Sequence, residues 1–238
     1  MLFRSLRREV VSPDRLVEDG AVGRLVHERP RDQLAGLGGQ HILLHVGQER
    51  RARLGAGGGE RLLVAHAGGG RDGAALLRLA LEAAALLGGG LFGPRWRTLV
   101  VAGTALPAAE ADALEAQAAG TPRVRFERHR PDLAACVAAA DVALSMCGYA
   151  TAAELLASGT PALLSPRRSD GEQVRRAERL ARLGAARVLA GDAHPADVAR
   201  AVRELAANPR PSLPPLDLGG AEASARELVR LHRERSAA

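Results

Sequence analysis

The sequence predicts an α/β protein built on a doubly wound parallel sheet, and three observations support this fold class. From Arg61 to Ala207, short apolar runs alternate regularly with segments of helical period. The apolar runs have no polar face, which is typical of strands that helices cover on both sides. Aromatic residues make up only 2% of the chain, while Leu, Val and Ala dominate. This composition suits close packing of helices on a sheet better than a β-sandwich.

The predicted elements follow one another with glycine, proline or polar turns between them. Continuous apolar runs, such as RLLVAHA and RTLVVAG, predict strands at 61–67, 97–103, 123–127, 141–145, 161–165 and 186–190. Apolar residues at a spacing of three to four predict helices at 73–87, 107–119, 132–140, 150–158, 172–183 and 196–207. Crossovers between parallel strands should be right-handed, and ligands should collect at the carboxyl ends of the strands.

Three regions are expected along the chain. Residues 1–60 lack a clean period and contain turn signals, so we expect an irregular lead-in. It includes one candidate strand, HILLHVG, and ends in a basic, glycine-rich linker, QERRARLGAGGGE. Residues 61–210 should form the sheet domain. Residues 211–238 should form a Pro-rich loop and a final polar helix, AEASARELVRLHRER.

The charge pattern disfavours specific nucleic-acid binding. The net charge is +6, and all 33 basic residues are arginine, scattered among acids on the predicted helices without aromatic residues between them. A mildly basic face suits anionic lipid or a phosphorylated substrate better, so contact with a membrane surface stays open. No apolar run reaches the roughly 20 residues that cross a bilayer. We expect a cytoplasmic protein, acting at the inner face of the membrane if lipid is involved.

Neither a metal nor a cofactor is expected from the spacing of potential ligands. Cys136 and Cys147 have no metal-type spacing and imply no disulfide framework. His41 and His45 would share one strand face without a third ligand. Two other histidines, His66 and His129, lie near strand ends, where they either face a cleft or are packed or solvated.

A glycine-rich loop, AHAGGGRDG at 65–73, follows the first predicted strand and opens the first predicted helix. Its bare amides can point at an anion, because no Cβ blocks the approach. Its glycines match the dinucleotide pattern G-x-G-x-x-G, which also needs an acid near the end of the second strand. That strand ends VVAGTALP without a carboxylate, which disfavours a nicotinamide or flavin enzyme. Arg71 and Asp72 fit either a phosphate contact or a surface ion pair.

The segment SMCGYATAAELLASGTP at 145–161 leads from a strand into a helix that carries Glu154. Thr151 and Glu154 fit a capping box, and the helix would then begin at Thr151. Alternatively the helix begins near Gly148, so that its first amides and the Thr151 hydroxyl receive a phosphate. Glu154 would then accept hydrogen bonds from two vicinal sugar hydroxyls. We expect this second arrangement, with Glu154 directed at a crevice shared with 65–73.

A third segment, PRRSDGEQVRRAERL, places Glu172 and Gln173 at the start of a helix beside the same sheet edge. Capping by Asp170 and a favourable interaction of Glu172 with the helix dipole explain the acids without a ligand. Gln173 is not explained by capping, although a solvated surface residue needs no explanation.

In this order, the three segments resemble the C-terminal half of GT-B glycosyltransferases of family 28, which includes the peptidoglycan N-acetylglucosaminyltransferase and related bacterial enzymes. The resemblance covers about Arg61 to Ala207 and implies a Rossmann-like domain that binds an NDP-sugar donor, usually a UDP-sugar, as substrate. It implies that the glycine loop lies beside the diphosphate, that the backbone around Arg130 meets the uracil, and that Glu154 meets the ribose. The start of the Glu154 helix would meet phosphate, and the Glu172 segment the donor sugar. The implied nucleotide-sugar-binding residues are Gly68, Gly69, Gly70, Arg71, Asp72, Arg130, Cys147, Gly148, Tyr149, Thr151, Glu154, Glu172 and Gln173.

Departures from the family pattern bear on activity. Ala150 stands where related enzymes have Asn, and Glu172 stands where the peptidoglycan enzyme has Gln. The resemblance implies that the family's N-terminal domain, which carries acceptor binding and usually the general base, is represented here by no more than the lead-in. We expect hexosyl or N-acetylhexosaminyl transfer from an NDP-sugar to an acceptor hydroxyl with inversion, with the catalytic base unknown. The acceptor is also unknown, and a separate N-terminal acceptor domain or subunit would complete the enzyme. The alternatives are a non-catalytic or split-enzyme subunit and an enzyme similar to NDP-sugar 2-epimerases.

Overall fold

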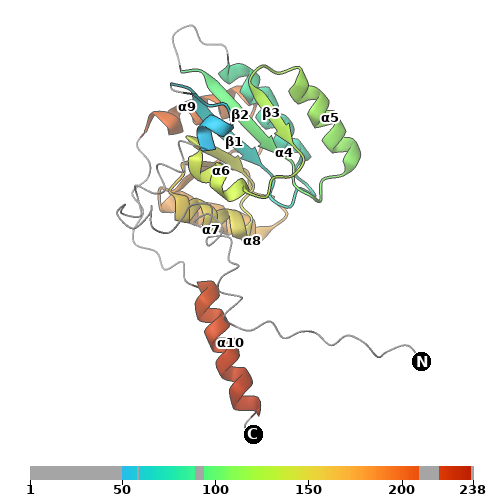
Figure 1. Ribbon diagram of the computed structural model, residues 1–238. Helices are drawn as coiled ribbons and strands as arrows, with labels where there is room; N and C mark the ends of the chain where they lie inside the picture. Colours follow the sequence, from blue (N-terminus) through green and yellow to red (C-terminus); the bar gives the residue numbers. More distant parts are fainter. Residues whose placement is uncertain (1–49, 58, 89–93, 209–219, 237–238) are drawn as a thin grey trace, which may run out of the picture. The chain divides into compact units, whose positions relative to one another are not determined.

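The computed structural model describes residues 50–57, 59–88, 94–208 and 220–236 (Figure 1). The chain divides into two units, one spanning residues 43–216 and the other combining 1–42 with 217–238. The predicted strand HILLHVG and most of the expected lead-in lie outside the described residues.

A six-stranded, fully parallel sheet forms the centre of the first unit. Its strand order is β3-β2-β1-β4-β5-β6. The chain adds β2 and β3 on one side of β1 and then returns to add β4, β5 and β6 on the other side. The strands are β1 (Arg61–His66), β2 (Trp96–Val101), β3 (Val124–Glu127), β4 (Val142–Ser145), β5 (Ala162–Leu164) and β6 (Ala186–Val188). The predicted doubly wound parallel sheet is therefore confirmed.

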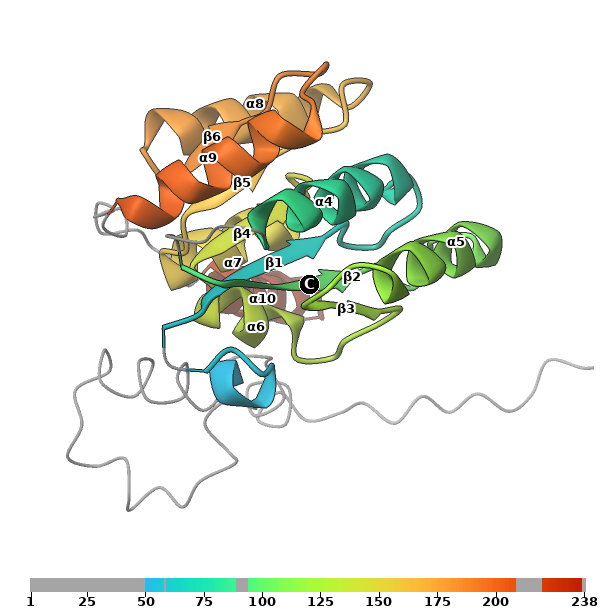
Figure 2. The same ribbon diagram turned by 90° about the horizontal axis from the view of Figure 1, so that it is seen from above.

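Helices cover both faces of this sheet (Figures 1 and 2). One face carries α4 (Ala74–Leu87), α5 (Ala108–Ala119) and α9 (Pro195–Ala207). The other face carries α6 (Leu133–Ala139), α7 (Tyr149–Ser158) and α8 (Gly171–Arg182). Small residues in these helices let them approach the sheet closely, in keeping with the low aromatic content.

Alternation along β1 shows how the two cores arise. Leu63 and Ala65 belong to the core beneath α4, α5 and α9, whereas Leu62 and Val64 belong to the core beneath α6, α7 and α8. All four side chains are fully buried. A period of two therefore sends successive residues to opposite faces, and both faces must be apolar.

The expected linker packs against the sheet domain over its described part. Residues 50–53 are helical, and Leu54 and Ala56 are buried in the core on the α6 side. Arg51 extends this contact, because its guanidinium donates to Asp141 at 2.7 Å and to the Glu60 carbonyl at 2.7 Å. The basic residues of this segment thus serve as structural anchors.

Asp141, at the entrance to β4, gathers three donors. Its carboxylate accepts hydrogen bonds from Arg51, from Arg61 and from the Leu62 N–H, each at 2.7 Å. Burial by itself raises the pKa of Asp141, but the hydrogen bonds from these donors outweigh burial and hold the pKa below its ordinary value of 3.8. This carboxylate therefore ties the 50–57 segment to both central strands.

Two loops at the carboxyl edge of the sheet fit against each other through glycine. The loop after β1 contains Gly70, with a φ of +92°, and the loop after β2 contains Gly103, with a φ of +98°. The Ala105 N–H donates to the Gly69 carbonyl at 2.8 Å. A Cβ on Gly70 would lie 2.6 Å from the Ala102 carbonyl oxygen, so a side chain has no room there.

The second unit contributes the helix α10 (Gly220–Ser236), which matches the predicted final polar helix. Leu228 and Leu231 are exposed on it. Among the described residues, none of the helices combines the length and apolar character that a membrane span requires.

We predict that Asp141→Asn lowers the free energy of unfolding by about 2–4 kcal/mol at neutral pH, because it removes the charge that two arginines face. The pKa of Asp141 is lower in the folded than in the unfolded state, so this stabilisation is present above the ordinary carboxyl pKa and is lost as pH falls through the folded pKa. Urea unfolding curves of the two proteins should therefore converge at low pH. Asp112→Asn, which removes an exposed partner of Arg128, is the control and should change little.

We also predict that Gly70→Ala lowers the melting midpoint by roughly 5 °C, because Ala is strained at this positive φ and its Cβ meets backbone. Gly69→Ala is the matched control, since a Cβ there has no neighbour within 4 Å. Thermal unfolding followed by circular dichroism measures both. Equal midpoints for the two variants would contradict the interlocked loops.

Candidate functional site

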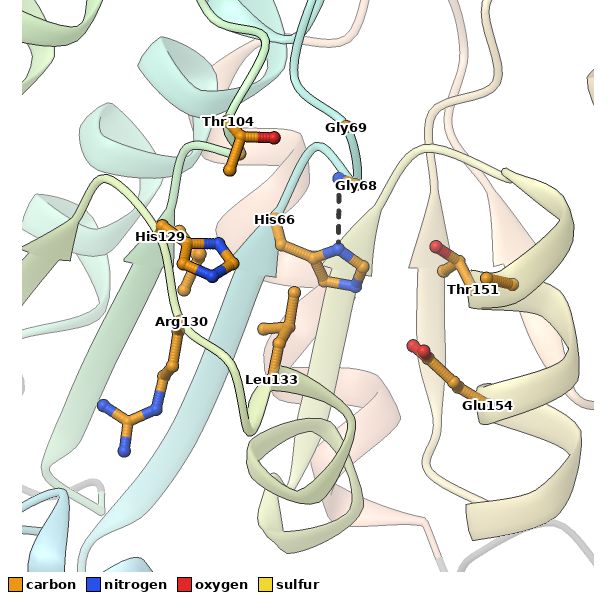
Figure 3. Close-up of a pocket in the computed structure, with 12 residues that line it drawn as sticks. His66, Gly68, Gly69, Thr104, His129, Arg130, Leu133, Thr151 and Glu154 are labelled. Atoms are coloured by element: carbon orange, nitrogen blue, oxygen red, sulfur yellow. Dashed lines mark hydrogen bonds between the residues drawn. The ribbon is translucent and has the colours of Figure 1, made fainter. Parts of the chain in front are cut away.

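A cleft of about 260 Å³ opens at the carboxyl edge of the sheet. It lies where the strand order reverses beside β1, the position at which doubly wound sheets bind ligands. Four segments form its walls: the loops after β1, β2 and β3, and the first turns of α7 (Figure 3). The residues that line it are His66, Gly68, Gly69, Val101, Gly103, Thr104, His129, Arg130, Leu133, Ala150, Thr151 and Glu154.

The glycine loop presents backbone to this cleft. Gly68 and Gly69 line the cleft, and Gly68 has a φ of +61° that favours glycine. Further along the loop, Gly70 packs against the loop after β2. The helix α4 then begins at Ala74 with Gly73 as its N-cap. The loop thus leaves an exposed stretch of main chain at the helix entrance, as an anion site requires.

The tip of the loop points to other partners. Asp72 forms an ion pair with Arg167, which lies between β5 and α8. Neither Arg71 nor Asp72 lines the cleft, and Arg71 is exposed. Of the two readings left open for the loop tip, the surface ion pair describes Asp72 in this structure. A role for Arg71 beside a diphosphate stays a prediction.

The helix α7 settles the choice between a capping box and a ligand arrangement. Gly148 is the N-cap, with extended backbone, and helix α7 begins at Tyr149. Thr151 is therefore inside the first turn and cannot cap the helix, so the capping box is wrong. The expected start near Gly148 is confirmed. Thr151 and Glu154 lie one turn apart and both line the cleft (Figure 3).

Glu154 is a half-buried carboxylate whose charge the protein leaves uncompensated. Burial raises its pKa above the ordinary value of 4.5, and no hydrogen bond or neighbouring charge of the described residues opposes that shift. Asp141 shows the contrast, because its three donors lower its pKa despite burial. Glu154 is thus available to accept hydrogen bonds from a molecule in the cleft.

Arg130 lines part of the cleft, but its guanidinium group is bonded to side chains outside the cleft. It donates to Glu127 at 2.8 Å and to the Cys136 sulfur at 3.0 Å, and it pairs with Asp132 at 2.8 Å. This network fixes the loop after β3 against α6. The predicted contact of the backbone near Arg130 with a nucleobase remains a prediction that this geometry allows.

The residues before and at the start of α7 are arranged differently from Thr151 and Glu154. Cys147 is fully buried, and its carbonyl accepts a hydrogen bond from Arg176 at 2.8 Å. Tyr149 is 81% exposed, and Arg176 lies over its ring at 5.3 Å from the centroid. Neither Cys147, Gly148 nor Tyr149 lines the cleft itself.

The third predicted segment begins α8 and lies outside the cleft lining. Asp170 is the N-cap, and its carboxylate accepts from the Glu172 and Gln173 N–H groups at 3.0 and 3.1 Å. Glu172 is exposed, and the Gln173 side-chain oxygen accepts from the Arg167 N–H at 3.2 Å. Capping therefore explains Asp170, while contacts of Glu172 and Gln173 with a donor sugar stay predictions.

Several residues that line the cleft were not predicted from the sequence. Thr104 and Gly103 belong to the loop after β2, whose sequence lacks a carboxylate and shows no binding motif. Leu133 belongs to an ordinary apolar helix. His66 and His129 were recognisable as residues near strand ends, and both line the cleft. A search of the described residues for three His, Cys, Asp or Glu side chains arranged to hold a metal finds none.

Comparison with known proteins gives this cleft a family context. The glycotransferase of kitacinnamycin is similar to this chain at 26% identity and a TM-score of 0.51, with 74% of this chain and 39% of that chain covered. MurG from Acinetobacter baumannii shares the fold at 18% identity and a TM-score of 0.53, with 71% of this chain and 52% of that chain covered. No curated protein matches the chain.

The chain therefore spans about two fifths to one half of the length of these solved structures. Residues 64–215 match the glycosyltransferase family 28 C-terminal domain, a span that contains the whole cleft and all the strands after β1. On this match, with the six-stranded sheet and its strand order, the chain belongs to glycosyltransferase family 28, and the part that it contains is the C-terminal domain.

Proposed function

We propose that this chain binds the nucleotide-sugar donor of an inverting glycosyl transfer, with a UDP-sugar as the first candidate. The observation that carries the proposal is the carboxylate of Glu154, which lines the same cleft as the glycine loop and has no partner among the described residues. A carboxylate accepts two hydroxyl donors at once, which suits a ribose diol. Exposed main chain at Gly69 suits the adjoining phosphates, whereas the Gly68 N–H already donates to His66.

The electrostatics of the cleft support an anionic ligand beside the carboxylate. The first turn of α7 offers unpaired N–H groups and the positive end of its dipole next to Thr151. Its N-cap, Gly148, supplies no side chain to satisfy those groups. A diphosphate in the cleft would therefore lie between two sets of main-chain donors, one from the glycine loop and one from α7.

The proposed reaction is displacement at the anomeric carbon. An acceptor hydroxyl oxygen forms the new bond to that carbon as the bond to the diphosphate oxygen breaks. The leaving diphosphate keeps the electron pair, and main-chain donors together with Arg71 stabilise its charge. A general base removes the acceptor proton. We place the acceptor site and the base in a second domain or subunit, because this chain covers only 39% and 52% of the two similar solved structures.

Our proposal for the acceptor is less specific than the one for the donor. A net charge of +6 suits a cytoplasmic enzyme whose acceptor is held at an anionic membrane face. The same partial coverage of the solved structures supports a second candidate, a donor-binding subunit that is inactive until its partner half is present. The two share the donor site, and adding the missing half distinguishes them.

We predict that UDP binds the wild-type chain and that Glu154→Gln weakens this binding at least tenfold, since an amide cannot replace a charged acceptor of two hydroxyls. The ligand-free variant should melt at the same temperature as the wild type or higher, because the substitution removes a carboxylate that burial disfavours. Isothermal titration calorimetry and thermal unfolding measure the two effects.

Glu178→Gln, the same substitution at an exposed position of α8, is the matched control and should leave UDP binding unchanged. Titrations with GDP, ADP and dTDP identify the preferred base. Wild-type protein that binds none of these nucleotides at millimolar concentration sinks the donor-site proposal. A Glu154→Gln variant that binds UDP as the wild type does removes Glu154 from it.

A further inference from the structure

Two buried polar residues end neighbouring strands of the sheet, and one of them, His66, lines the cleft. His66 ends β1 and Ser145 ends β4, and the two residues pair in register. Both side chains face the α6 and α7 side, because alternation places them with Val64 and Ala143 of that core. His66 is 1% exposed and Ser145 is fully buried. Polar residues at such positions normally have partners.

The hydrogen bond of His66 identifies its protonation state. The Gly68 N–H donates to Nδ1 of His66 at 3.3 Å, so Nδ1 carries a lone pair (Figure 3). Burial lowers the pKa of His66 to about 4, which keeps the ring neutral at physiological pH. The single ring proton of the neutral imidazole is then on Nε2. His66 thus presents an N–H donor.

That donor has no partner in the part of the chain that the structure describes. Nε2 of His66 and Oγ of Ser145 are both buried and unpaired there. Leaving such groups unpaired costs stability, so a folded protein keeps them where something else completes them. His66 also lines the cleft, and its ring lies between the Gly68–Gly69 main chain and Glu154 (Figure 3). Because His66 lines the cleft, a molecule bound there can supply the partner that Nε2 lacks among the described residues.

We propose that Nε2–H of His66 donates a hydrogen bond to an oxygen of the ribose-phosphate part of the bound nucleotide. The inference rests on the proposed function and adds to it a binding residue in the cleft floor. His66 lies between the loop that we propose binds phosphate and the carboxylate that we propose binds the ribose diol. This position favours a contact with the ribose-phosphate part of the ligand over one with the nucleobase or the donor sugar. The neutral ring is a donor at Nε2, so the ligand atom it meets must be an acceptor.

A purely structural role for His66 would depend on Nδ1 and not on Nε2. In that case only the Nδ1 bond to Gly68 matters, because it holds the glycine loop in place. A water molecule would then satisfy Nε2. The two roles use different ends of the imidazole, which allows two substitutions to separate them.

The test compares His66→Asn with His66→Gln. The Asn side-chain oxygen occupies the position of Nδ1 and can accept from Gly68, but it leaves no donor at the Nε2 position. The Gln amide reaches the Nε2 position and can donate there, but it gives up the Gly68 bond. We expect His66→Asn to weaken UDP binding about tenfold relative to His66→Gln, measured by calorimetry. An Asn variant that binds UDP as tightly as the Gln variant overturns the inference, whether both match the wild type or both are weaker.

Titrations of the same variants with UMP and uridine locate the acceptor oxygen. A penalty for Asn with UMP and UDP only assigns it to phosphate, and an equal penalty with uridine assigns it to ribose. If the wild-type protein binds none of the three ligands, the proposed function itself fails. If it binds them and Asn equals Gln, only this inference fails.

A measurement on the unaltered protein guards against variants that fold poorly. ¹H–¹⁵N spectra of the histidine side chains should show the His66 Nε2–H signal, and saturating UDP should shift it while Nδ1 stays unprotonated. An Nε2 signal that UDP leaves unmoved overturns the inference as well.

Discussion

The parallel pairing of β1 with β4 is the constraint on which the rest of the structure depends. It brings His66 and Ser145 into register and reverses the strand order beside β1, so the loops that leave β1 and β4 diverge to opposite sides of the sheet. A crevice must remain between them. The glycine loop lines it on one side and α7 on the other, which is why glycine main chain and Glu154 share one cleft.

Two polar side chains that line the cleft differ from Asp141 in having groups that the described residues leave unpaired. Asp141, outside the cleft, gathers three donors and titrates below its ordinary range. Among the described residues, no partner offsets the desolvation of Glu154, and none pairs with the buried Nε2 of His66. Such local conflicts reduce stability and are expected where a ligand completes the site. Glu154 and His66 thus add to the glycine pattern as indications of a binding surface.

Much of the fold was predictable because each strand is buried on both faces. An apolar run such as RLLVAHA can then only be a central strand, and the helices between such runs must cover the sheet. The start of α7 was less certain, since Thr151 and Glu154 fit a capping box equally well. The partners of arginine were beyond sequence reasoning, because Arg51 meets Asp141 across 90 positions. The unpaired Nε2 of His66 likewise appears only when neighbouring strands are placed together.

The central claim is that a nucleotide binds between the glycine loop and α7. Backbone ¹H–¹⁵N spectra recorded during a UDP titration test it most directly, because every main-chain donor reports on its own surroundings. We expect the Gly68, Gly69 and Thr151 amide signals to move together and to saturate at one dissociation constant. The signal of Gly184, which precedes β6 outside the cleft, should stay fixed. Saturable shifts elsewhere, with Gly68 and Thr151 unmoved, would contradict it.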